Sequence, residues 1–91
     1  MTPNEIAIII TRAAKAMGAT VESMMTGQTD HQSATARRLA FYYMFTHGQT
    51  IENIAQAFKM GDDTVKRGIN KIKYSLEEYK TSLTAIDGRE V

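Results

Sequence analysis

The apolar residues of this chain recur every three or four positions, which is the spacing of side chains on one face of an α-helix. The first segment carries such a face, formed by Ile6, Ile10, Ala13 and Met17. Its start, TPNE, is a capping box with a proline in the first turn. The isoleucine run would also suit a strand, but the cap and the stop at Gly18 favour a helix.

Capping residues and glycines divide the rest of the chain into four more predicted helices and no strands. The third helix is apolar on almost all sides after Arg38, which is typical of a central, buried helix. The sequence therefore predicts an all-α, compact five-helix domain with a long C-terminal helix. After the first, the expected helices are VESMM, about 34–46, IENIAQAFK and about 63–86.

The segment IAQAFKMGDDTVKRGINKIK belongs to a pattern typical of a helix-turn-helix, which we place at about residues 50–75. Ala55 is small enough for two helices to cross closely, and Gly61 would allow the sharp change of direction. In such motifs the second helix enters the major groove of DNA. Six apolar residues stand where they would lock the two helices together: Ile51, Ile54, Phe58, Met60, Val65 and Ile69.

The polar positions of the second helix are mostly cationic, which suits contact with DNA. Lys66, Arg67 and Asn70 are candidates for base-edge contact, because Arg and Asn form paired hydrogen bonds to guanine and adenine. The alternative to DNA contact is structural: the cations of this helix would form a solvated face, and the pair Arg37 and Arg38 would serve only solubility. Candidates for holding phosphates are Arg37, Arg38, Lys59, Lys71 and Lys73.

Asp62 and Asp63 stand at the start of this helix, where a phosphate would otherwise be expected. Their structural interpretation is capping, because carboxylates in a first turn bond its open N–H groups and favour the positive end of the helix dipole. Their functional interpretation is acceptance of a hydrogen bond from N4 of cytosine. On either interpretation we expect them to weaken non-specific DNA binding.

Composition and charge leave DNA binding open and argue against other classes. The chain has 91 residues, enough for a single domain (1–91), with a net charge of +1 and a pI near 8.0. It has no cysteine, so disulfides and thiol nucleophiles are excluded. The longest apolar run is too short to span a bilayer, and the N-terminus is a poor signal peptide. We expect a cytoplasmic protein without a membrane partner.

Catalytic chemistry finds little support in the sequence. His31 and His47 are far apart and have no Ser, Asp or Cys partner at a recurring catalytic spacing. The sequence shows no metal-ligand cluster and no glycine-rich loop for phosphates. We therefore expect no enzyme activity, no cofactor and no small-molecule substrate.

Apolar residues alternate by four and three through the C-terminal helix, as in a heptad seam. The second half of this seam has two possible uses. It can form a homodimer, the use that we favour, or it can fold back on the Ile8–Ile9 side of the first helix. After the seam, residues 87–91 are expected to be frayed. The seam residues concerned are Leu76, Tyr79, Leu83 and Ile86.

The order of these parts resembles the C-terminal DNA-binding domain (domain IV) of the bacterial replication initiator DnaA, over roughly residues 10–76. The shared order is a helix ended by glycine, a short helix, a polar loop, an arginine-led buried helix and a helix-turn-helix. The resemblance implies a helical domain that binds a short duplex box and has no enzymatic site. It implies that a recognition helix enters the major groove while a basic loop, here GQTDHQSAT, reaches the minor groove.

The family's signature residues match this sequence in part. Arg37 corresponds to the arginine that heads the buried helix, and Thr64 and Val65 match the end of the signature Asp-His-Thr-Thr-Val. Asp62 and Asp63 replace the family's histidine and first threonine. The turn is one residue shorter, as in Trp repressor-like helix-turn-helix regulators.

The expected function is sequence-specific binding of double-stranded DNA. The protein would act as a small regulator of transcription or replication, encoded by a phage or a mobile element. The alternative is a DnaA-like fold used for protein–protein interaction or dimerisation without DNA binding. That alternative would use the late seam or the aromatic face around Phe41 and Tyr42.

Overall fold

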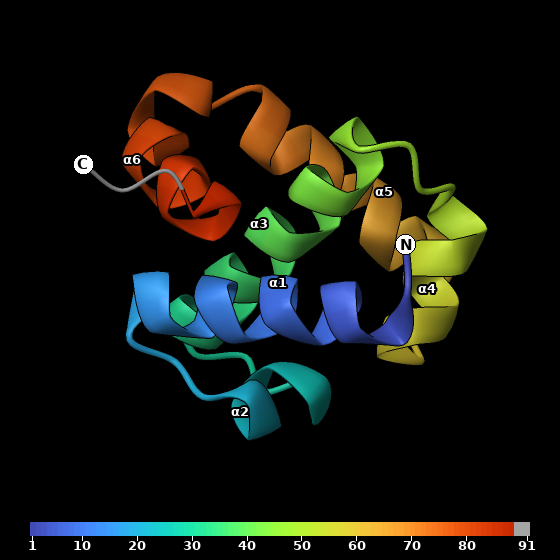
Figure 1. The fold of residues 1–91 in the computed structure, drawn as a ribbon. Coiled ribbons are helices and arrows are strands. Elements are labelled where there is room, and N and C mark those ends of the chain that lie inside the picture. Colours follow the sequence, from blue (N-terminus) through green and yellow to red (C-terminus); the bar gives the residue numbers. More distant parts are fainter. Residues whose placement is uncertain (89–91) are drawn as a thin grey trace.

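Six helices make up the part of the chain that the computed structural model describes, residues 1–88 (Figure 1). No strand occurs within these residues, so the all-α prediction is confirmed, whereas the count of five helices is wrong. The helices are α1 (Pro3–Met17), α2 (Val21–Met25), α3 (His31–Thr46), α4 (Ile51–Phe58), α5 (Asp62–Lys73) and α6 (Leu76–Asp87).

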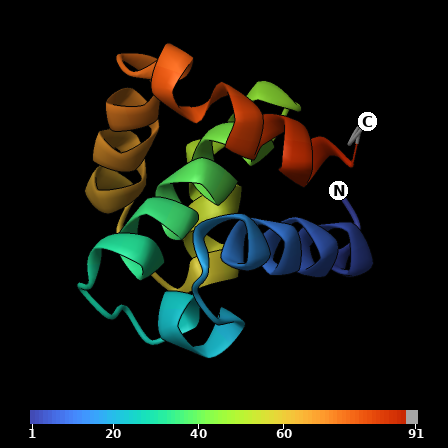
Figure 2. The same ribbon diagram turned by 90° about the vertical axis from the view of Figure 1, so that its left-hand side faces the viewer.

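The expected long C-terminal helix is broken at Tyr74 and Ser75, where the Ser75 backbone leaves the helical region (φ −133°, ψ 33°). An unbroken helix over residues 63–86 would be about 36 Å long. The longest dimension of the molecule is 34 Å. The break lets α6 turn back and lie along α1 (Figures 1 and 2).

The seam of α6 therefore meets the chain's own core. Ile86 is fully buried, Tyr79 and Leu83 are partly buried against the core, and Leu76 is 40% exposed. This is the fold-back arrangement on the first helix, with Ile9 buried and Ile8 exposed. Homodimer formation through the seam stays a prediction.

The chain end is more ordered than expected as far as Gly88. Asp87 ends α6, and Gly88 caps the helix in the left-handed region (φ 77°). Arg12 of α1 supports this end by donating from Nη1 to the carbonyl oxygen of Ile86 at 3.2 Å. The rest of the expected frayed tail, residues 89–91, lies outside the described residues.

Helix α3 is the central element, as its apolar sequence predicted. It packs against α1 on one side and α5 on the other (Figures 1 and 2). Side chains of α3 at the centre of this core include Leu39, Phe41 and Met44, which are at most 1% exposed. The Phe41 ring meets the Phe58 ring of α4 edge-on, with centroids 4.8 Å apart.

Helix α3 begins at His31, three residues before the expected start. Its N-cap is Asp30, whose carboxylate accepts from the Ser33 backbone N–H at 3.0 Å and from the Ser33 hydroxyl at 2.9 Å. These bonds hold the pKa of Asp30 below its ordinary value. The polar connector is correspondingly shorter than the sequence indicated.

The turn between α4 and α5 is made differently from the expectation. Gly61 has an extended backbone (φ −75°, ψ 153°) that any residue can adopt. The left-handed residue is Lys59 (φ 54°, ψ 45°), at the C-cap of α4. Lys59 is the only residue other than glycine with a positive φ among residues 1–88. The sharp change of direction therefore comes from Lys59 and not from Gly61.

Candidate nucleic-acid interface

Helix α5 has one buried face and one outward crest. Successive side chains are rotated by about 100° around a helix. Val65, Gly68, Ile69 and Ile72 are buried and mark the inner face. The direction opposite to them is occupied by three exposed residues, Asp63, Arg67 and Asn70.

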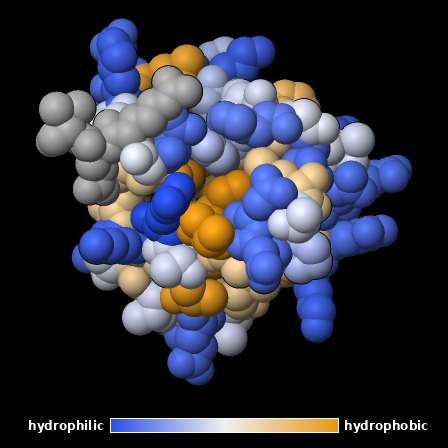
Figure 3. All heavy atoms as spheres, in the orientation of Figure 1, coloured by the Kyte–Doolittle hydropathy of each residue, from blue (hydrophilic) through white to orange (hydrophobic). Residues whose placement is uncertain are grey.

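The crest is accessible because α5 lies at the edge of the molecule. Figure 2 shows its outer side turned away from the other helices. The face seen in Figure 3, where α1 lies in front, has a different character, with an apolar area at its centre. Ile8 of α1 is 48% exposed. The cations predicted for DNA contact lie on α5, in the turn before it, and on α3, which packs against α5.

Lysines flank the crest on both sides, and the whole set predicted on α5 is exposed. Thr64 and Lys71 lie on the flank next to α3. Lys66 and Lys73 lie on the opposite flank, where they line a shallow hollow with Phe45 and Ile51. Lys59, also exposed, stands in the turn before α5.

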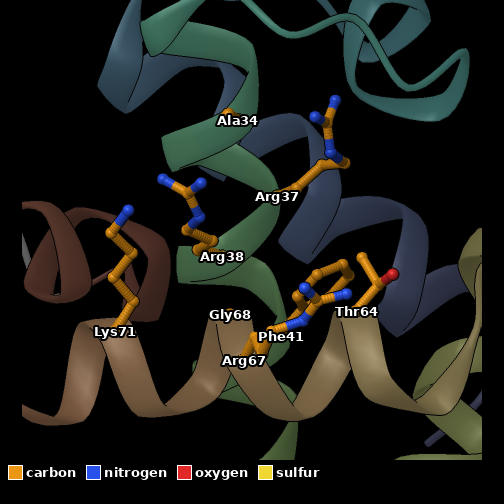
Figure 4. A pocket seen from close by; sticks show the side chains of 8 residues that line it. All are labelled: Ala34, Arg37, Arg38, Phe41, Thr64, Arg67, Gly68 and Lys71. Carbon is orange, nitrogen blue, oxygen red and sulfur yellow. The ribbon is translucent and has the colours of Figure 1, made fainter.

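A cationic hollow of about 360 Å³ lies between α3 and α5 (Figure 4). Figure 4 shows Arg38 and Lys71 rising from the two helices on the same side of the hollow. Its lining contains four cationic side chains and no carboxylate. The lining residues are Ala34, Arg37, Arg38, Phe41, Thr64, Arg67, Gly68 and Lys71.

The two helices approach closely beside this hollow because Gly68 has no side chain. A Cβ added to Gly68 would lie 2.8 Å from Cδ2 of Phe41 and 3.2 Å from Cγ of Arg38. Phe41 is 1% exposed, so its ring has little room to move. Gly68 thereby sets the spacing between the cations of α3 and those of α5.

Arg37 and Arg38 are neighbours in sequence but have different surroundings. The Arg37 guanidinium points toward the end of α2, where Nη1 donates to the carbonyl oxygens of Ser23 (3.3 Å) and Met24 (3.2 Å). Its Nη2 donates to the carbonyl oxygen of Gln28 at 2.6 Å. Burial, and next the charge of Arg38, lower the pKa of Arg37. Both Nη atoms of Arg37 thus donate to backbone carbonyl oxygens, whereas Arg38 faces the hollow beside α5. The expected phosphate contact of Arg37 stays a prediction.

The acidic start of α5 has no side-chain cap. Gly61 is the N-cap, and the helix shows no side-chain cap hydrogen bond, although Asp62 and Asp63 occupy its first turn. Interaction with the helix dipole remains available to both carboxylates. Asp63 lies on the crest, one turn before Arg67, whose Nε donates to the Asp63 carbonyl oxygen at 3.4 Å.

Tyr74 was not among the residues expected at the interface. Its backbone is still helical (φ −82°, ψ −2°), so its side chain continues the crest beyond Asn70. It is 81% exposed, more than any other large hydrophobic side chain among residues 1–88. The sequence did contain a signal for Tyr74, because an aromatic residue stands there on the polar side of the helix. We missed it because we expected the C-terminal helix to continue through this position.

Comparisons with known proteins found no matching family model, no similar curated protein and no similar solved structure. Within residues 1–88, no group of three or more His, Cys, Asp or Glu side chains is placed to hold a metal ion. No helix in this part of the chain is long and apolar enough to cross a membrane.

Proposed function

We propose that the protein binds double-stranded DNA in a sequence-specific manner, with α4 and α5 acting as a helix-turn-helix. The observation that carries this proposal is the outer side of α5, where Arg67 and Asn70 are exposed between lysines on both flanks. A helix of this kind fits the major groove, where its crest meets base edges and its flanks meet the two phosphate backbones.

The position of each residue on α5 suggests its role. Arg67 and Asn70 are the candidates for base-edge contact, and Lys66, on one flank, is less central than the sequence indicated. Lys71 and Arg38 would hold one backbone strand. Lys66, Lys73 and Lys59 would serve the other strand.

Asp63 shapes this interface because it is a carboxylate on the crest. It disfavours approach of the DNA backbone, so it reduces binding to duplexes that offer no compensating contact. A cytosine N4 amino group is the base-edge donor that a carboxylate accepts from. Asp63 would therefore add selectivity to a helix whose other crest residues, Arg67 and Asn70, both carry donors.

The proposal is tested by selecting bound sequences from a random duplex pool at low salt. We expect enrichment of a short motif, and loss of binding when Arg67 and Asn70 are both replaced by alanine. The matched control is Lys15→Ala and Lys80→Ala, two exposed residues on α1 and α6. A pool that shows no enrichment, with no retardation of mixed duplexes, would refute DNA binding.

A salt titration separates backbone contact from base contact. Replacing Lys71 and Lys73 with glutamine should reduce the slope of log affinity against log salt by about 2, because each phosphate contact contributes about 0.9. Replacing Asn70 should lower affinity for the selected site and leave the slope unchanged. Whether the bound site serves transcription or replication follows from where the selected motif occurs.

A second candidate function, protein binding, is favoured by a groove of about 580 Å³ between α3 and α6. Tyr42, Tyr43, Leu76 and Leu83 contribute to its lining. Phe41, which was expected on this aromatic face, is buried instead. Self-association that Leu76→Ser abolishes, without any DNA retardation, would favour this second function.

A further inference from the structure

We propose that the hollow between α3 and α5 is a discrete binding site for one phosphate group. Arg38 and Lys71 would donate to its oxygens, with the Thr64 hydroxyl as a further donor. The site lies on the face proposed for DNA, so its use with DNA rests on the proposed function. Its affinity for phosphate itself does not.

The charges of the lining are the first argument for this site. Arg38, Arg67 and Lys71 come from two helices, and no carboxylate lines the hollow with them. Like charges at close range repel one another, and a bound anion would relieve that repulsion.

The shape of the hollow is the second argument. Its volume is about 360 Å³. One water molecule takes about 30 Å³, so the hollow has room for a phosphate group and several waters. Arginine forks form paired hydrogen bonds with phosphate oxygens. Arg38 of α3 and Lys71 of α5 lie on the same side of the hollow (Figure 4), so a tetrahedral oxyanion there can accept from both helices, whereas a chloride makes fewer bonds.

The third argument is that the site is held in place. The stem of Arg38 packs beside Gly68, and Phe41 fixes the distance between the two helices. Arg38 is partly buried, whereas Arg67 and Lys71 are exposed. Ordering Arg38 costs less entropy on binding, because part of that cost is met by folding.

The phosphate has two possible sources with the same chemistry. One is the backbone of a duplex lying along the α3 flank of α5. The other is a free phosphate or phosphate ester, which would then compete with DNA for the hollow. The experiment has two arms: the first tests whether the hollow binds phosphate, and the second tests whether that phosphate comes from DNA.

The first arm is a titration of isotope-labelled protein with sodium phosphate, followed by NMR, against sodium chloride at equal ionic strength. We expect saturable shifts of the Thr64 and Gly68 amides with phosphate alone. Arg38→Gln and Lys71→Gln should each weaken phosphate binding by about tenfold. Lys15→Gln, an exposed residue on α1, is the matched control and should leave it unchanged.

Two results of this arm would overturn the proposal. One is a set of shifts that follows ionic strength whichever anion is added. The other is an equal loss with Lys15→Gln and Lys71→Gln, since general attraction would then explain the binding. Unfolded variants are recognised by their collapsed NMR spectra, and Thr64→Val, which removes only the hydroxyl, then provides an independent test by weakening phosphate binding.

The second arm measures release of a mixed duplex by phosphate and by chloride at equal ionic strength. Stronger release by phosphate, lost in Lys71→Gln, identifies the DNA backbone as an occupant. Phosphate binding without release of the duplex identifies the free ester as the ligand and refutes the shared site. Phosphate binding by a protein that binds no duplex supports the hollow and refutes the proposed DNA binding.

Discussion

Arg37 and Arg38 show that two identical side chains, adjacent on one helix, can have separate tasks. Consecutive helix positions differ by about 100° in direction. Arg37 therefore reaches the carbonyl oxygens at the end of α2, whereas Arg38 faces the hollow beside α5. The sequence could not distinguish them, because the carbonyls that Arg37 contacts are 9 to 14 residues away.

Replacing each arginine with glutamine should separate stability from binding. Arg37→Gln leaves backbone carbonyls without their donor, so we expect a loss of about 2–3 kcal/mol of unfolding free energy. Arg38→Gln should change stability by less than about 0.5 kcal/mol and should lower duplex affinity several-fold. Urea unfolding and fluorescence anisotropy measure the two effects. Equal stability losses in both variants would contradict the assignment.

Gly68→Ala should destabilise the protein although alanine favours helices. The gain in helix propensity is about 1 kcal/mol. The new Cβ would meet the buried Phe41 ring at 2.8 Å, and overpacking of this kind costs about 1–3 kcal/mol. We expect a net loss of about 1 kcal/mol in urea unfolding. The control is Asn70→Ala on the exposed side of α5, and a Gly68→Ala variant as stable as this control would contradict the packing argument.

At the scale of elements, the α4–α5 turn places the crest of α5. The sequence pattern located this turn correctly but assigned its sharp bend to Gly61. Lys59 instead adopts the left-handed conformation that makes the bend. It stands at the C-cap of α4, where a left-handed residue can bond its N–H back to the helix. Gly61 serves as the N-cap of α5, a role that glycine also fills.

Lys59→Gly should stabilise the protein. A left-handed conformation costs an ordinary residue about 1–2 kcal/mol. The extra freedom of glycine in the unfolded chain costs about 0.5–1 kcal/mol, so we expect a net gain of about 0.5–1 kcal/mol. Lys59→Ala removes the same charge and keeps the strained backbone, so it should show no gain. Similar urea midpoints for the two variants would argue against backbone strain as the cause.

At the scale of the whole molecule, two carboxylates make the stability of the fold depend on pH. Hydrogen bonds from Ser33 lower the pKa of Asp30 below its ordinary 3.8, and bonds from Thr2 lower that of Glu5 below its ordinary 4.5. The unfolded chain takes up these protons more readily than the folded one. The stability they contribute is therefore fully present above the ordinary values and is lost as pH falls through the lowered ones.

The melting temperature should accordingly fall between about pH 5 and about pH 2. Asp30→Asn should be less stable than the original protein near neutral pH and should lose less on acidification, since it lacks one of the two groups. Thermal unfolding followed by circular dichroism at several pH values measures both effects. Parallel pH profiles for the two proteins would show that Asp30 makes no contribution.

The sequence by itself determined the all-helical class, the capping box at Thr2, and the central position of α3. These features follow from residues that are close along the chain, through helix periodicity and first-turn hydrogen bonds. The crest of α5 was also largely readable, because its exposed residues are fixed by helix geometry once the helix exists.

Only the tertiary structure decided how these parts meet. The break before Ser75 arises because α6 finds its apolar partner on α1. The hollow has its shape because Gly68 lets α5 approach Phe41 of α3. The Arg37 guanidinium points away from α5 because it donates to carbonyl oxygens at the end of α2. Each of these contacts joins residues distant in sequence, so local patterns could not reveal them. The sequence shows only which residues are cationic, whereas the packing of α3 against α5 decides which of them line the same hollow.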